Sequence, residues 1–318
     1  MIKYSWWLIM KTCLVIYNPN SGKYNKEQIL PKIKKILKEY KYSADIKETE
    51  YKGNATEIIS SCSYYDLVIS IGGDGTFNEV MTGNFKRKDR LVLCHLPSGT
   101  TNDIGAMWGY GKNMLSNLKL ALDGKIKRID MCTINGKPFV YSAGFGKFMT
   151  VPYDTPRKLK KRLGHLAYIK EGIKDFFRKV KLYDITYTVD GEEYRGLFSF
   201  ALITNANRVA GINNFYKDIK LNDNRFEILM CNITHLTDIV KTLYFFARYD
   251  ASKIPGFYFY KTDNFKFKFN TPLKKPLCID GESLSDLSGE YEIRIDHDVH
   301  VLMPSKNIKD LFIKEKED

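Results

Sequence analysis

The sequence has few of the residues from which metal centres and disulfide frameworks are built. Its six cysteines, at positions 13, 62, 94, 132, 231 and 278, lie between 32 and 99 residues apart, and its five histidines form no HExxH pattern. Because there is no CxxC pair, neither a zinc site nor a small disulfide-stabilised fold is indicated. Scattered thiols of this kind are typical of a reducing compartment, so we expect a cytoplasmic protein.

Long apolar runs are also lacking. The N-terminal segment MIKYSWWLIM is followed by Lys11, whereas a transmembrane helix needs about 20 consecutive apolar residues. No small-residue cleavage site follows, so a signal peptide is not expected. We interpret residues 1–9 as an extension ahead of a start at Met10, or as a weak interfacial anchor through Trp6 and Trp7.

Acidic residues are too few to balance the basic ones. The 318-residue chain has 50 Lys and Arg against 37 Asp and Glu, a net charge of +13, and ten of the cations fall with two acids in residues 157–181. An anionic partner is therefore expected: a nucleotide, a membrane surface or a nucleic acid. Apolar residues at positions 166, 169, 173 and 176 share one helical face. The segment is either a structural helix with a solvated basic side or a contact with anionic lipid headgroups.

The first third of the chain alternates continuous apolar runs with amphipathic stretches. Residues 13–17, 67–71 and 91–94 are apolar and end in glycine- or asparagine-containing loops, as do strands that are buried on both faces. Between them, residues 27–40 and 55–61 carry apolar side chains at helical spacing. This alternation predicts a parallel α/β sheet.

Beyond about residue 125 the apolar residues alternate with a period of two, which is typical of antiparallel strands with one face outward. The segments that show it are residues 184–189, 194–205, 225–233 and 264–269. Helices are expected near residues 165–179 and 236–249, and a short one at residues 307–314.

The fold class predicted from these patterns is α/β + β. A chain of this length holds one large or two modest domains. We predict an α/β domain with a parallel sheet at residues 11–127, to which the chain returns at residues 303–318, and an antiparallel β-rich domain at residues 128–302.

Three polar, glycine-containing loops follow strands of the predicted parallel sheet. They read NPNSGK at residues 18–23, GGDGT at 72–76 and LPSGTTND at 96–103. Loops at the carboxyl ends of parallel strands converge on one crevice, and glycine-rich turns before a helix bring backbone N–H groups to a phosphate. Asp74 among these amides is unfavourable unless a cation lies between. Because Walker A and GxGxxG patterns are missing, P-loop and Rossmann sites are disfavoured.

Together with three later motifs, these loops resemble the diacylglycerol kinase catalytic-domain superfamily, specifically its soluble bacterial lipid kinases. The later motifs are Asp130, KLNDNRF at residues 220–226 and DGE at residues 280–282. The resemblance covers nearly all of the chain from Met10. It implies an α/β ATP-binding catalytic domain followed by a β-rich substrate domain, with the active site in the cleft.

The resemblance also implies a nucleotide site and a catalytic magnesium ion. Asp74 would help to hold Mg²⁺ against the phosphates of ATP, while Thr49 would lie on the adenosine side. The implied ATP contacts are Asn18, Pro19, Asn20, Ser21, Gly22, Thr49, Gly72, Gly73, Asp74, Gly75, Thr76, Phe77, Asn78 and Thr100.

Asp280 and Glu282 supply two carboxylates that flank a glycine. A DGE tripeptide on its own is an ordinary turn, but within the full set of motifs the resemblance implies that one carboxylate would lie at a metal and one at a substrate hydroxyl. Either Asp280 or Glu282 would be the base.

A second, structural Mg²⁺ is implied in the segment that contains Lys220, Asp223 and Arg225. Asp223 would give its carboxylate and the other two residues their backbone carbonyls, an all-oxygen ligand set that suits Mg²⁺. Asp103 and Asp130 would belong to a network of water molecules that links this ion to the nucleotide site. Where many relatives have Asp-Gly, this chain has Asp223-Asn224. Asparagine can keep the left-handed turn, but the affinity of the loop for the ion is in question. The alternative is that Asp223-Asn224 is an ordinary turn.

The implied reaction is phosphorylation of diacylglycerol to phosphatidic acid, with ATP and Mg²⁺, by a cytoplasmic protein peripherally associated with the inner membrane face. Alternative acceptors are a sphingoid base, a ceramide-like lipid, phosphatidylglycerol or monoacylglycerol. NAD kinases also carry GGDG-type loops, and a non-catalytic nucleotide-binding protein is a further alternative. Nucleic acid is not expected as a partner, because the basic run lacks an RNP-type or helix-turn-helix signature. Family members are often dimers, which implies a homodimer.

Overall fold

The computed structural model of the chain describes residues 10–22, 24–140, 142–146, 149, 180–209, 212–213, 218–232, 256–273, 277–284, 288–306 and 308–313. The helices expected near residues 165–179 and 236–249 lie outside these residues, as do residues 1–9 and nearly all of the basic stretch at 157–181. Among the described residues, no helix has both the length and the apolar character needed to cross a bilayer.

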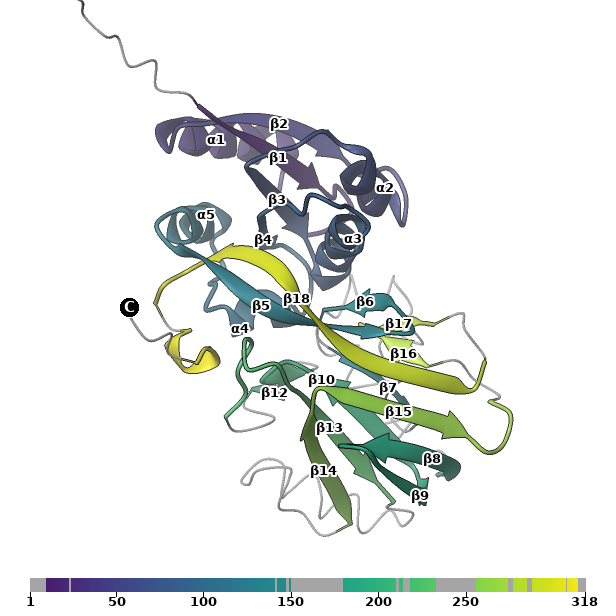
Figure 1. Ribbon diagram of the computed structural model, residues 1–318. Coiled ribbons are helices and arrows are strands. Elements are labelled where there is room, and N and C mark those ends of the chain that lie inside the picture. Colours follow the sequence, from purple (N-terminus) through teal and green to yellow (C-terminus); the bar gives the residue numbers. More distant parts are fainter. Residues whose placement is uncertain are drawn as a thin grey trace, which may run out of the picture.

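The N-terminal part is the predicted parallel α/β sheet, with helices on both of its faces (Figure 1). Its strands are β1 (Lys11–Tyr17), β2 (Tyr42–Glu48), β3 (Leu67–Gly72) and β4 (Leu93–Pro97), in the order β2-β1-β3-β4. The helices are α1 (Lys26–Glu39), α2 (Asn54–Ser61), α3 (Asp74–Phe85), α4 (Asp103–Met107) and α5 (Met114–Leu122). The three apolar runs at 13–17, 67–71 and 91–94 thus correspond to β1, β3 and β4, and the two amphipathic stretches to α1 and α2. The pattern did not predict β2, which lies at the sheet edge with half of its residues exposed.

The C-terminal part is antiparallel, as predicted, but its strands at residues 200–204 and 226–231 are buried on both faces instead of presenting one face outward. Its six-stranded sheet has the order β14-β13-β10-β7-β16-β17. The strands are β14 (Phe257–Thr262), β13 (Phe226–Cys231), β10 (Phe200–Thr204), β7 (Ser142–Gly146), β16 (Cys278–Ile279) and β17 (Glu282–Ser283). A separate two-stranded ribbon consists of β11 (Arg208–Val209) and β12 (Ile212–Asn213).

The single strand predicted at residues 194–205 is in fact two strands in different sheets. β9 (Glu192–Phe198) pairs with β8 (Tyr183–Val189), whereas β10 pairs with β7 and β13. Ser199 lies between β9 and β10, and it is anchored because its backbone N–H donates to the carbonyl oxygen of Cys231 at 2.8 Å. Ser199 is flanked by Phe198 and Phe200, as it would be in one continuous strand, so the sequence pattern did not reveal the change of sheet.

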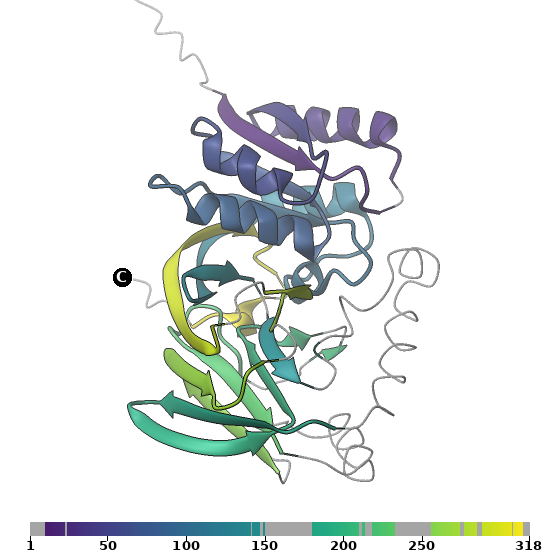
Figure 2. The ribbon, with the colours of Figure 1, turned by 90° about the vertical axis from the view of Figure 1, so that its right-hand side faces the viewer.

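Two long strands connect the two parts of the molecule. β18 (Glu290–Met303) pairs with β15 (Asn264–Phe269) at its start and with β4 at its end, and β5 (Lys125–Ile134) runs antiparallel beside it. The result is one ten-stranded sheet that reaches from the first part into the second (Figures 1 and 2). Its strands include the short β6 (Lys137–Phe139), which pairs with β5. The predicted division near residue 128 stays a prediction.

The two hydrophobic cores meet within β5 and β18. On β5, Met131 belongs to the first core and Cys132 to the second. On β18, Val301 packs in the first core and Ile293 in the second, with a register shift between Asp296 and Val299. The chain end returns to the first core, where Leu311 and Phe312 are buried; instead of the expected helix, a 3-10 turn covers Lys309–Leu311.

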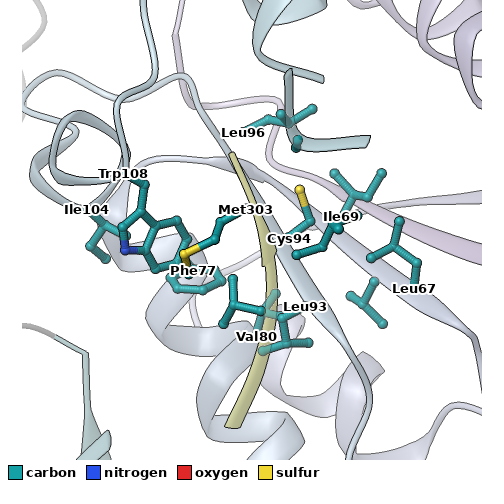
Figure 3. Packing of buried hydrophobic residues seen from close by; sticks show 14 of the residues in the cluster. Leu67, Ile69, Phe77, Val80, Leu93, Cys94, Leu96, Ile104, Trp108 and Met303 are labelled. Carbon is teal, nitrogen blue, oxygen red and sulfur yellow. The ribbon is translucent and has the colours of Figure 1, made fainter. Parts of the chain in front are cut away.

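Helix α3 is fixed in the first core by apolar contacts from its buried side. Phe77 packs edge-on against Trp108 with ring centroids 5.4 Å apart and lies 4.8 Å from the ring of His95. Val80 and Met303 line the same region (Figure 3). This packing sets the position of α3, whose first turn carries the GGDGT motif.

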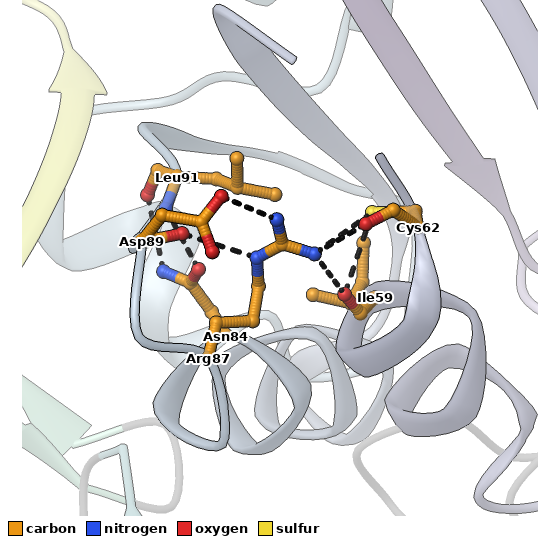
Figure 4. A network of polar contacts seen from close by, with 6 residues as sticks. All are labelled: Ile59, Cys62, Asn84, Arg87, Asp89 and Leu91. Carbon is orange, nitrogen blue, oxygen red and sulfur yellow. Dashed lines mark hydrogen bonds and ion pairs between the residues drawn. The ribbon is translucent and has the colours of Figure 1, made fainter. Parts of the chain in front are cut away.

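The other end of α3 is held by Arg87. Its guanidinium donates to the backbone oxygens of Ile59 and Cys62, at the C-terminus of α2, and forms an ion pair with Asp89 (Figure 4). Asn84 exchanges two hydrogen bonds with the backbone of Leu91. Cations at a helix C-terminus bond its last carbonyls favourably, so α2, α3 and the segment before β4 are held together.

We expect His95 to make the fold sensitive to acid. Burial lowers the pKa of His95 to about 3 from 6.5, so the unfolded chain takes up a proton that the folded chain excludes. The free energy of unfolding is therefore highest above pH 6.5, and it decreases as the pH falls from there toward 3. In urea unfolding, the free energy of unfolding should fall up to about 1.4 kcal/mol per pH unit more steeply for the natural chain than for His95→Phe. Identical pH dependence for the two proteins would contradict this assignment.

Candidate active site

The three polar loops lie against one another at the carboxyl edge of β1, β3 and β4. A Cβ atom on Gly99 would lie 2.6 Å from the Cα atom of Gly73, so the second and third loops touch through their backbones. Gly22 has a φ of +79°, and a Cβ there would lie 2.5 Å from the carbonyl oxygen of Ser98. Side chains larger than glycine would push the loops apart. The convergence expected for parallel strands is thus present in the structure.

Side-chain hydrogen bonds cross from loop to loop. Asn18 donates from its Nδ2 atom to the Oγ1 atom of Thr76 at 2.8 Å, and the hydroxyls of Ser21 and Ser98 are 3.0 Å apart. The backbone N–H of Asn20 donates to the side chain of Asn18 at 2.9 Å. These contacts hold the first loop over the N-terminus of α3, where the dipole and the backbone N–H groups favour a phosphate.

The other predicted nucleotide contacts lie around this point with different exposure. Thr49 is buried at the end of β2 and donates its N–H to the carbonyl oxygen of Tyr17 at 2.9 Å. Thr100 follows Gly99, whose backbone exchanges two hydrogen bonds with the side chain of Asn102. The side chain of Phe77 is fully buried, so Phe77 can offer a ligand only its backbone. Pro19, Gly72 and Gly75 belong to the same loops.

Asp74 connects the GGDGT loop to the loop after β4. Its carboxylate oxygens accept hydrogen bonds from the backbone N–H groups of Asp103 and Ile104, at 3.0 and 3.2 Å, at the start of α4. Burial, with the nearby charge of Asp103, raises the pKa of Asp74 to about 7, although the two amides oppose the shift. A carboxylate held beside other anions favours an added cation, so Asp74 suits a magnesium ion that arrives with a ligand rather than one held by a cluster of acidic side chains.

Asp103 has a partner that the sequence did not indicate. Its side chain is 2% exposed and forms an ion pair with Arg208 on β11, with the guanidinium Nε atom 2.9 Å from the carboxylate. Asp130 accepts a hydrogen bond from the backbone N–H of Asn224 at 2.6 Å, and its carbonyl oxygen accepts one from Asn205. Arg208 lies in no recognisable motif, so its contact with Asp103 could be found only from the structure. The predicted water network stays a prediction.

The DGE segment forms the tight turn of a hairpin between β16 and β17. Asp280 and Gly281 have φ values of +46° and +79°, the left-handed conformation that such two-residue turns require. The carboxylate of Asp280 accepts hydrogen bonds from the backbone N–H groups of Val140 and Ser142, at 2.6 and 2.9 Å, and from the side chain of Asn78. Asp280 therefore holds the hairpin against α3.

Glu282 has a different environment from Asp280. Its side chain is 55% exposed and forms an ion pair with Lys52 at 2.9 Å. Lys52 lies in the loop before α2, which is anchored because Glu79 of α3 accepts hydrogen bonds from the N–H groups of Gly53 and Ala55. The hairpin thus presents one carboxylate that is tied into the backbone and one that is accessible. Lys52 contacts the accessible carboxylate, and Glu79 anchors the loop that contains Lys52. The sequence indicated neither residue.

The predicted second magnesium site contains a lysine. The Nζ atom of Lys261, on β14, is 2.6 Å from the carboxylate of Asp223, whose other oxygen accepts the N–H of Arg225. Asn224 has a φ of +60°, so the expected left-handed turn is confirmed. No cluster of three or more His, Cys, Asp or Glu side chains with metal-binding geometry occurs in the described part of the chain. The Nζ atom of Lys220, whose backbone carbonyl is the predicted ligand, donates to the carbonyl oxygen of Asp310. With Lys261 on Asp223, these residues do not fit a resident metal ion.

Comparison with known proteins shows that the chain is similar to diacylglycerol kinases. Residues 12–134 match the model of the diacylglycerol kinase catalytic domain. The diacylglycerol kinase of Bacillus subtilis (strain 168) is 29% identical over 305 residues, which are 95% of this chain and 99% of the relative. That of Staphylococcus saprophyticus is 29% identical over 297 residues, 93% of this chain and 96% of the relative.

The fold has counterparts among solved structures. The crystal structure of a diacylglycerol kinase from Bacillus anthracis superimposes with a TM-score of 0.75 at 23% identity, covering 92% of this chain and 97% of the other. The mixed sheet with parallel N-terminal strands and the antiparallel C-terminal sheet is therefore a known architecture. The catalytic-domain match over residues 12–134 and the diacylglycerol kinases that align along nearly the whole chain support a lipid kinase enzyme.

Proposed function

We propose that this lipid kinase transfers the γ-phosphoryl group of ATP, bound with Mg²⁺, to the hydroxyl of diacylglycerol and so forms phosphatidic acid. The observation that carries the proposal is the contact of Asn78 with Asp280, which joins the first helix after the GGDGT loop to the DGE hairpin. A phosphate-binding loop and an accessible carboxylate thereby border the same site. The names of the full-length relatives suggest diacylglycerol as the acceptor.

The three loops would bind the phosphates of ATP. The N-terminus of α3 offers backbone N–H groups beside the closely packed Gly73 and Gly99, and Asp74 would hold the metal ion. Mg²⁺, when bound, supplies neutralisation of charge on the phosphate oxygens. Phosphoryl transfer depends mainly on positioning and charge neutralisation, so a rigid set of loops supplies much of the catalysis.

Glu282 is the residue we assign as the base. Its carboxylate would take the proton of the acceptor hydroxyl as the hydroxyl oxygen bonds to the γ-phosphorus, while the bond to the departing ADP oxygen breaks. Its carboxylate is exposed and is held by Lys52 at 2.9 Å. Asp280 is assigned a positioning role, because its oxygens already accept three hydrogen bonds.

We further propose that the chain works in the cytoplasm, at the inner membrane face, where its lipid substrate lies. The basic stretch at residues 157–181 supports this through its sequence, because each cation near an anionic surface contributes about 1 kcal/mol to binding. We also propose that the chain forms a homodimer.

Transfer of label from radioactive ATP to a panel of lipids in mixed micelles tests the acceptor. We expect labelled phosphatidic acid from diacylglycerol, at a rate above that for sphingoid base, ceramide, phosphatidylglycerol and monoacylglycerol. Omission of Mg²⁺ should abolish the product. Faster transfer to another lipid would change the acceptor but keep the enzyme class, whereas transfer to NAD alone would contradict the proposal.

Glu282→Gln should lower kcat about 100-fold or more, since loss of a general base costs roughly 10²–10⁴-fold. Its melting temperature and its affinity for ATP should stay unchanged, because the side chain is exposed. Glu193→Gln, at an exposed position on β9, is the matched control and should retain full kcat.

Asp280→Asn should act through structure instead, because it weakens charge-assisted hydrogen bonds to backbone N–H groups. We expect urea unfolding to show a loss of roughly 1.5–3 kcal/mol. The assignment of the two carboxylates would be reversed if Asp280→Asn kept its stability and lost turnover while Glu282→Gln kept turnover.

Gly99→Ala should weaken ATP binding, because the added methyl group would lie 2.6 Å from the backbone of Gly73 and separate the two loops. Calorimetric titration with Mg-ATP should show a Kd about tenfold higher or more, corresponding to about 1.4 kcal/mol. Gly111→Ala is the control, since a methyl group there meets no atom closer than 3.9 Å. Equal Kd values for both variants would argue against close-packed loops as the ATP site.

A further inference from the structure

Lys261 lies between two acidic side chains at the base of the loop formed by residues 218–225. Its Nζ atom is 2.6 Å from the carboxylate of Asp223 and 3.3 Å from that of Glu227. The side chain of Asp223 is 10% exposed and that of Glu227 only 2%. The ammonium is thus shared between two carboxylates that have little access to water.

The fold determines this position of the lysine. Lys261 on β14 is paired directly opposite Glu227 on β13, so the two side chains project from neighbouring backbone positions of the sheet. The ammonium also approaches the carbonyl oxygen of Asp218 at 3.5 Å, and the carbonyl oxygen of Lys261 accepts a bond from Arg225 at 3.4 Å. One residue therefore contacts both ends of the loop.

The two carboxylates need a cation at this place. The Oε2 atom of Glu227 is buried and has no hydrogen-bond partner among the described residues. A buried carboxylate is strongly unfavourable unless a cation or hydrogen-bond donors compensate its charge. Lys261 is the cation that contacts both Glu227 and Asp223 in the described structure.

Both oxygens of the Asp223 carboxylate already have donors, the Lys261 ammonium on one and the backbone N–H of Arg225 on the other. Mg²⁺ requires near-octahedral oxygen ligands at about 2.1 Å, so it would have to compete with Lys261 for this carboxylate. We propose that Lys261 takes the place of a resident divalent cation at the 218–225 loop, so that this loop keeps its structure without metal.

The 218–225 loop in turn holds Asp130 of β5. The loop holds Asp130 through the N–H of Asn224, and the N–H of Asp130 donates to the carbonyl oxygen of Leu221 at 2.7 Å. A loop held by a lysine keeps these contacts at any magnesium concentration. The inference concerns loop stability and does not depend on the proposed reaction.

Thermal melting without nucleotide tests the inference, with the full-length protein in EDTA or in MgCl₂. The natural chain should melt at the same temperature in both. Lys261→Met removes the charge but keeps the apolar stem, and should melt about 5 °C lower in EDTA. Mg²⁺ should raise the melting temperature of this variant, and the rise should vanish when Asp223→Asn is added. Lys261→Arg, which keeps a cation, should remain close to the natural chain.

Two outcomes of the melting experiment would overturn the inference. One is a rise with Mg²⁺ in the natural chain that Asp223→Asn removes, which would put a metal ion at the loop. The other is a Lys261→Met variant that melts like the natural chain or gains no response to Mg²⁺.

If Lys261→Met does not fold, binding of Mn²⁺ measured by electron paramagnetic resonance still tests whether Asp223 ligates a divalent cation. The natural chain and Asp223→Asn should bind equal numbers of Mn²⁺ ions without nucleotide. One ion fewer in Asp223→Asn would overturn the inference. Because lipid kinase turnover enters neither measurement, failure of the proposed function would leave these results unaffected.

Discussion

The site depends on the hydrogen bonds that the carboxylate of Asp280 accepts. Val140 and Ser142 donate from the backbone just before and at the start of β7, and Asn78 donates from the second turn of α3. These groups come from segments that are far apart in the sequence, and the left-handed turn at Asp280 and Gly281 directs the carboxylate toward all of them. Charge-assisted hydrogen bonds of this kind are about twice as strong as neutral ones. They connect the β-rich part to the helix that follows the GGDGT loop.

Much of this arrangement could be predicted from sequence because its causes are local. Strands β1, β3 and β4 are buried on both faces, which requires continuous apolar runs, and the glycine loops after them are forced together by the parallel topology. The turn at Asp280-Gly281 has the residue types that a left-handed hairpin turn needs. In each case a short segment of sequence contains the physical reason for its structure.

The rest could not be predicted because it depends on pairing between distant segments. Arg208, Lys52 and Lys261 are three of 50 basic residues, and no local pattern distinguishes them from solvated ones. The partner of Lys261 follows from the register of β13 with β14, and period-two alternation does not fix register between two strands. The division of residues 194–205 into two sheets has the same origin. The pattern of apolar residues shows which face of a strand is buried, but not which sheet the strand belongs to.

The distribution of these basic residues bears on where a metal ion is needed. Asp103, Asp223 and Glu282 each have a Lys or Arg partner within 3 Å, which compensates their charge within the protein. Asp74, by contrast, has two backbone N–H groups and forms no ion pair with a Lys or Arg among the described residues, while burial and the charge of Asp103 raise its pKa to about 7. A partly buried carboxylate of this kind is stabilised by a cation that arrives with the ligand. The protein thus compensates the neighbouring acids itself and leaves Asp74 as the position where a nucleotide-bound Mg²⁺ would contribute most.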